Sequence, residues 1–86
     1  MPFGGATYVA ERDADRLMSQ LYNVWALMRD SQWRTLTQIS ETINYPEASV
    51  SARLRDLRKR KFGAHTVERE YVRRGLFKYR VIPNEE

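Results

Sequence analysis

Residues 45–61, YPEASVSARLRDLRKRK, contain the pattern on which the expected fold depends. Val50, Leu54 and Leu57 recur at intervals of four and three residues, which places side chains on one face of an α-helix. We therefore expect an amphipathic helix over residues 46–61 with this face buried. The opposite face is expected to carry small side chains near the start of the helix and cations towards its end: Ala48, Ser51, Ala52, Arg55 and Lys59.

The size and composition of the chain limit the functions it can have. A chain of 86 residues forms one small domain with little room for a substrate cavity beside its core, which disfavours an enzyme. The absence of cysteine excludes a disulfide scaffold and thiolate metal sites, and is compatible with a reducing cytoplasm. No apolar run approaches membrane-spanning length, and the first residues lack the pattern of a signal peptide. We expect a soluble, cytoplasmic protein that does not contact a membrane.

The net charge of +4 is distributed unevenly along the chain. Residues 46–80 contain eleven Lys and Arg against four acids, whereas the remainder contains four Lys and Arg against seven acids. Clustered cations bind polyanions because they release the counterions that condense on phosphates. The C-terminal half is therefore expected to bind a polyanion.

Another amphipathic helix is expected over residues 11–30, after a flexible arm over residues 1–10. Its apolar stripe consists of Leu17, Leu21, Val24 and Met28, widened by Trp25 and Leu27. Most of this broad face is expected to close the core beneath the other elements. A part of it, at Tyr22, Trp25 or Leu27, leaves open a homodimer contact through this helix.

The residues before the cationic helix predict a shorter helix followed by a tight turn. Thr35 and Gln38 fit a capping box, in which each side chain bonds the backbone N–H of the other. Asn44 suits the left-handed position after a helix, and Pro46 suits the opening of the next one. The apolar face of the short helix consists of Leu36, Ile39 and Ile43. The layout of short helix, turn and longer helix is that of a helix-turn-helix.

The remaining sequence predicts an antiparallel hairpin. Polar and apolar residues alternate in two segments, 65–69 and 77–82, on either side of a turn at residues 73–75. The alternation places Tyr79 on the inward face. Residues 83–86 are expected to fray.

The order of these elements, with a short strand at Trp33, resembles the winged helix-turn-helix fold. It is similar to the DNA-binding core of the MarR and ArsR types without their dimerisation helices. The segments that carry the resemblance are 33–40, 44–46, 49–57 and Phe62-Gly63. It departs from many relatives at the turn over residues 44–46, where they have Gly followed by a small aliphatic residue and Ser. The resemblance implies an α+β domain over residues 11–82, with three helices and a small antiparallel β-hairpin as its wing.

The resemblance also implies a sequence-specific protein for double-stranded DNA, of the kind that regulates transcription in bacteria and their phages. The helix 46–61 would enter the major groove, where residues 49–55 would read or orient on base edges. The basic wing 69–78, with Arg73 and Arg74 at its tip, would grip the backbone or the minor groove. The candidate DNA-contacting residues are Thr37, Gln38, Ser49, Ser51, Ala52, Arg53, Arg55, Lys59, Arg73, Arg74 and Lys78.

Other interpretations of the same residues stay open from the sequence. An architectural, excisionase-like protein would use the same surface to bend DNA, and a winged-helix adaptor would bind a protein through the apolar face of helix 11–30. His65 lacks the partners that a catalytic or ligand role needs. Glu68 and Glu70 are expected to pair with nearby cations rather than to hold a metal ion. We expect no metal, cofactor or small-molecule ligand.

Overall fold

The structure is a computed structural model that describes residues 5–84, with side chains described for residues 15–84. The helices of this part of the chain are α1 (Gly5–Met28), α2 (Leu36–Ile43), α3 (Glu47–Leu57) and the short 3₁₀ helix η1 (Arg60–Phe62). The strands are β1 (Arg34–Thr35), β2 (Thr66–Arg73) and β3 (Leu76–Ile82). None of the helices described is long and apolar enough to cross a membrane.

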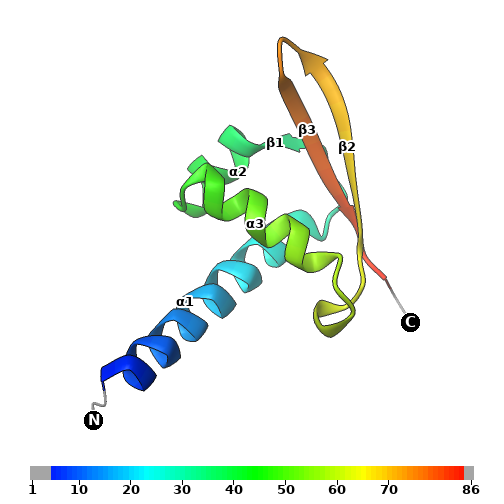
Figure 1. Ribbon diagram of the computed structural model, residues 1–86. Coiled ribbons are helices and arrows are strands. Elements are labelled where there is room, and N and C mark those ends of the chain that lie inside the picture. The colour runs from blue at the N-terminus through cyan, green and yellow to red at the C-terminus, as the bar shows by residue number, and fades with distance from the viewer. Residues whose placement is uncertain (1–4, 85–86) are drawn as a thin grey trace.

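The strands form one antiparallel sheet in the order β1-β3-β2, so the hairpin strand β3 is central. Together with the three α-helices, this sheet confirms the expected α+β class. In Figure 1, α3 lies across the centre, between α1 and the β2–β3 hairpin. The N-terminal part of α1 and the end of the hairpin project away from this centre in different directions.

Both ends of α2 are capped as the sequence predicts. The Thr35 hydroxyl accepts the Gln38 N–H at 3.1 Å, and the Gln38 side chain accepts the Thr35 N–H at 2.9 Å. Asn44 ends the helix in the left-handed region, with φ 64°, and its N–H donates to the Ser40 carbonyl at 2.8 Å. The Ser40 hydroxyl also donates to the Tyr45 carbonyl at 2.5 Å, which fixes the turn between α2 and α3.

The cationic helix is shorter than predicted, because α3 ends at Leu57 and not at Lys61. Lys59 adopts an extended backbone with ψ 147°, and η1 follows it. At about 100° per residue, a continuing helix would turn Phe62 by roughly 120° away from the buried stripe. The break instead lets Phe62 pack against the core. It also returns the chain towards β2, where the His65 N–H donates to the Leu57 carbonyl at 2.9 Å.

The two ends of the domain also differ from expectation. Helix α1 begins at Gly5, so the part of the expected arm over residues 5–10 is helical, while residues 1–4 lie outside the described chain. Gly5 is the first residue of the helix, so the cost of glycine, which applies to helix interiors, does not prevent helix formation over residues 5–10. Asn84, in the segment expected to fray, donates to His65 Nδ1 at 2.9 Å and to the Gly63 carbonyl at 3.1 Å. Residues 85–86 lie outside the described chain.

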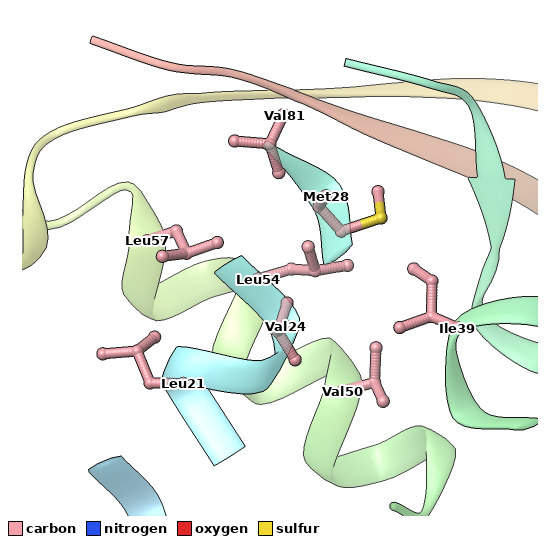
Figure 2. Packing of buried hydrophobic residues seen from close by; sticks show 8 residues of the cluster. All are labelled: Leu21, Val24, Met28, Ile39, Val50, Leu54, Leu57 and Val81. Carbon is pink, nitrogen blue, oxygen red and sulfur yellow. The ribbon is translucent and has the colours of Figure 1, made fainter. Parts of the chain in front are cut away.

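One apolar cluster joins the three α-helices to the sheet, as Figure 2 shows. Its buried members are Leu21, Val24, Met28, Ile39, Val50, Leu54, Leu57 and Val81. The predicted stripe of α3 is therefore confirmed, and Val81 attaches the base of the hairpin to the helices. Leu17 was expected in the α1 stripe but is 42% exposed, because the buried cluster begins one turn later at Leu21.

Candidate functional site

A cationic hollow of 320 Å³ lies between α3 and the face of the β2–β3 hairpin that is turned towards it. Its lining residues are Ser51, Leu54, Arg55, Arg58, Val67, Arg69 and Tyr79. We call Arg55, Arg58 and Arg69 the arginine cluster. Three guanidinium and two hydroxyl side chains thus line the hollow together with the apolar Leu54 and Val67. Groups of this kind bind anions, because guanidinium and hydroxyl groups donate hydrogen bonds.

Helix and strand periodicity bring these side chains together. The three polar residues that α3 contributes are spaced at i, i+4 and i+7, so they lie along one side of the helix. Arg69 pairs directly with Tyr79 across the hairpin, and residues directly opposite each other share a face of the sheet. Val67 and Val81 form the next pair on that face, and Val81 is fully buried. The hollow therefore lies where the inner face of the hairpin continues past the core.

The arginine cluster makes no ion pair with any acid of residues 15–84. Arg69 lies 4.5 Å from the ring centre of Phe77, which holds its side chain across the inner face of the hairpin. Ion pairs elsewhere join Arg34 to Asp30, Arg53 and Lys59 to Asp56, Lys78 to Glu70, and Arg80 to Glu68. Three exposed cations that line one hollow without a counterion from residues 15–84 can bind an anion there.

The structure divides the predicted contact residues of α3 between two sides of the helix. Ser51 and Arg55 lie on the side of the cationic hollow. Ser49, Ala52 and Arg53 instead line a hollow between α3 and α1. Periodicity placed Ser51, Ala52 and Arg55 on the face opposite the core, whereas Ser49 and Arg53 joined the predicted contacts through the family resemblance. The sequence does not show on which side α1 packs.

Arg53 corrects the predicted contact set most clearly. Its side chain is only 12% exposed, and Nε lies 2.9 Å from Asp56 Oδ2. Its Nη1 donates to Oε1 of the buried Gln20 of α1 at 2.9 Å. Arg53 therefore ties α3 to α1, and it does not face the cationic hollow.

Three further predicted contacts already have partners within the chain. The Thr37 hydroxyl donates to Glu47 Oε2 at 2.7 Å, which links α2 to the first turn of α3. The side-chain Oε1 of Gln38 accepts the Thr35 N–H in the capping box of α2. Lys59 Nζ lies 3.0 Å from Asp56 Oδ1, although its side chain remains 53% exposed. Their side chains therefore stabilise the helices, and they do not converge with the arginine cluster.

Lys78 also lies away from the arginine cluster. It precedes Tyr79 on β3, so strand alternation points it to the outer face of the hairpin. There it pairs with Glu70 at 3.2 Å, beside the Arg80–Glu68 pair at 2.6 Å. These pairs confirm the prediction that Glu68 and Glu70 pair with cations. The two basic side chains cover the Trp33 ring at 5.4 Å and 4.7 Å.

Arg73 and Arg74 lie at the projecting end of the hairpin, as predicted (Figure 1). The chain reverses through Arg74 and Gly75, with φ 46° and 79°. Two successive positive φ angles suit a two-residue hairpin turn. Both arginines are exposed and make no ion pair with the acids of residues 15–84.

The list of candidate contacts lacks three residues of the hollow, namely Arg58, Arg69 and Tyr79, although Arg69 is the first residue of the predicted basic wing 69–78. Arg58 lies seven residues after Ser51 and therefore shares its side of α3, a signal that the sequence contains. The pairing of Arg69 with Tyr79 depends on the hairpin register. The sequence alone defines this register only to within one or two residues. The hairpin faces α3 because of tertiary packing, which no local sequence pattern predicts.

The pKa of the Asp56 carboxyl lies below its ordinary value of 3.8. Burial alone would raise this pKa, but hydrogen bonds and positive charge from Lys59 and Arg53 outweigh burial and lower it. A carboxyl with a lowered pKa in the folded state stabilises the fold above its unfolded-state pKa. That contribution is lost as the pH falls through the folded-state pKa.

The substitution Asp56→Asn should therefore lower the free energy of unfolding at pH 7 by up to about 1 kcal/mol, the scale of a partly exposed ion pair. The difference from the unmodified chain should shrink as the pH falls below 3.8. Urea denaturation of both proteins at pH 7 and pH 3 measures the difference. An equal difference at the two pH values would contradict this assignment.

Within residues 15–84, no group of three or more His, Asp or Glu side chains could hold a metal ion. His65 instead stacks on the Trp25 ring, with ring centres 4.2 Å apart. Comparison of the chain with protein-family models, with curated proteins and with solved structures yields no significant match.

Proposed function

We propose that this chain is a winged helix-turn-helix protein that binds double-stranded DNA sequence-specifically, as a transcriptional regulator of the bacterial and phage type. In this proposal α3 enters the major groove, and the β2–β3 hairpin is the wing that follows the adjacent backbone. The observation that carries the proposal is the arginine cluster, which no acid of residues 15–84 neutralises. A polyanion supplies the missing counter-charge.

The solvent-facing side of α3 suits a major groove. Ala48 is exposed and Ser51 half-buried, and both are small enough to let the helix backbone approach base edges. Arg55 follows one turn after Ser51 and is exposed, so it can reach a guanine edge or a phosphate. Glu47, oriented by Thr37, lies in the first turn, where a carboxylate can accept from a cytosine amino group.

The hollow between α3 and the hairpin suits a single backbone phosphate. Arg58 and Arg69 approach it from two different elements, and guanidinium groups bind phosphate oxygens with two parallel hydrogen bonds. The hydroxyls of Ser51 and Tyr79 add further donors. A phosphate bound there would fix α3 and the wing in one register on the duplex, because backbone contacts position a protein on DNA.

The double substitution Arg58→Ala/Arg69→Ala tests this proposal. Two lost phosphate contacts should reduce the slope of log K against log salt by about 2 and weaken duplex binding at least tenfold. Fluorescence-anisotropy titration against a randomised duplex pool at several salt concentrations measures both quantities, with a single-stranded pool for comparison.

The matched control is Lys78→Ala, which also removes a cation from the hairpin but on its outer face. It should change duplex affinity by less than about threefold. Equal losses for Lys78→Ala and for either single arginine variant would mean that net charge, and not the hollow, drives binding. Binding of single strands as tight as binding of duplex would also count against the proposal.

We further propose that two copies of the chain associate through α1. Its Leu17, Met18 and Tyr22 side chains are 42%, 52% and 68% exposed. An apolar hollow of 290 Å³, which Met18 and Tyr22 help to line, lies beside them. Paired recognition helices read two half-sites, which extends the short footprint of one small domain.

The exposed part of this face differs from the sequence prediction. Trp25 and Leu27 were expected in the contact, but both are half-buried and pack against the core. Only Tyr22 of the predicted three is exposed. The proposed contact is therefore centred closer to the N-terminus of α1.

The substitution Met18→Lys/Tyr22→Lys should convert such a dimer to a monomer, because it places two like charges at a self-associating face. Sedimentation velocity across a concentration series measures the change. Ser19→Lys, also exposed on α1 but outside the apolar face, should leave the sedimentation coefficient unchanged. An unmodified chain that sediments as a monomer at all concentrations, alone and on duplex, would refute the dimer.

A further inference from the structure

The hairpin tip, which we define as residues 71–77, combines apolar and cationic side chains that no other element covers. Tyr71, Val72 and Leu76 are 59%, 43% and 38% exposed. Arg73 and Arg74 lie among them, exposed and without an ion pair to residues 15–84. Figure 1 shows this tip projecting well beyond the helices. A projecting tip of this composition can contact a partner that offers both negative charge and an apolar interior.

The backbone of the tip is built to present these side chains. Tyr71 pairs with Phe77 and Arg73 with Leu76, so Val72 is an extra residue that forms a bulge in β2. Bulges redirect side chains and increase the local twist. The edge-to-face contact of Tyr71 with Phe77, at 5.5 Å between ring centres, stiffens the strands just below the turn. Leu76 is the first residue of β3 after the turn, so it is the apolar residue of β3 that lies closest to the hairpin turn.

We propose that the hairpin tip is a minor-groove wedge, in which Arg73 and Arg74 bind the flanking phosphates while Leu76 enters between base pairs and bends the duplex. This inference rests on the proposed DNA-binding function. The interior of a base stack is apolar and the groove walls carry phosphates, which matches the two kinds of side chain at the tip. An apolar protein surface would leave the two arginines without counter-charge.

The dimensions of the groove also favour a wedge. The minor groove of B-DNA is about 6 Å wide. Two strands about 4.8 Å apart, with side chains on both, do not fit into that width. The tip can enter only where the groove opens, and apolar insertion opens it by unstacking and kinking a base step. Flexible TA and CA steps are the preferred sites for such a kink.

The test compares Leu76→Ser with Leu76→Met on a short duplex that the unmodified chain selects from the randomised pool and that contains a TA or CA step. Energy transfer between dyes on the two ends reports bending, and anisotropy reports binding of the same duplex. The unmodified chain should bend the duplex by roughly 20–90°. Leu76→Met retains an apolar wedge and should preserve most of this bend, whereas Leu76→Ser should lose at least half of it.

Both variants change an exposed residue, and circular dichroism verifies that they fold like the unmodified chain. Duplex binding without a bend, or an equal bend by Leu76→Ser, would overturn the wedge and leave the proposed DNA binding intact. Absence of duplex binding by the unmodified chain would overturn both. A bend that is lost in Leu76→Ser and retained in Leu76→Met supports the wedge. It would mean that the protein bends the DNA that it binds.

Discussion

The rest of the structure depends on one packing constraint, which is that the buried stripe of α3 contacts α1, α2 and the sheet at the same time. Val50, Leu54 and Leu57 fill the centre of the core, and Val81 brings the base of the hairpin onto it. Once these contacts are made, the remaining sides of α3 have fixed neighbours. One side joins α1 through Arg53, the opposite side faces the hairpin, and only the side between them faces solvent. The position of the cationic hollow is therefore a consequence of core packing.

The same arrangement determines which cations pair with acids and which do not. Three of the four acids over residues 46–80 pair with cations: Asp56 with Arg53 and Lys59, and Glu68 and Glu70 with cations on the outer face of the hairpin. The fourth, Glu47, accepts a hydrogen bond from the Thr37 hydroxyl. These pairs weaken the positive potential on that outer face. The arginine cluster and the hairpin tip keep their charge on the other side and at the end of the hairpin. Cations without an ion pair to the acids of residues 15–84 therefore lie in the hollow beside α3 and at the end of the hairpin, which are the surfaces proposed to contact DNA.

Local features of the fold were predictable from the sequence, and features that depend on distant neighbours were not. The Thr35 cap and the left-handed Asn44 follow from side-chain chemistry within a few residues, and both are confirmed. Arg53 lies two residues before Arg55, so helix periodicity already turns it away from the side of the hollow, a signal that the sequence contains. Its contact with Gln20 of α1 is a tertiary feature. Lys78 could have been excluded, because the alternation that points Tyr79 inward points Lys78 outward. The early end of α3 depends on the burial of Phe62, which is a tertiary effect.

The most direct test of the central claim is an NMR titration that follows the arginine Nε–Hε signals as a duplex pool is added. The account predicts that the signals of Arg55, Arg58 and Arg69 shift progressively with duplex, because these side chains gain phosphate or base partners. The signals of Arg53 and Arg80 should stay in place, because Asp56 and Glu68 already hold them. Shifts confined to Arg53 and Arg80, or no shift in the arginine cluster at saturating duplex, would contradict the account.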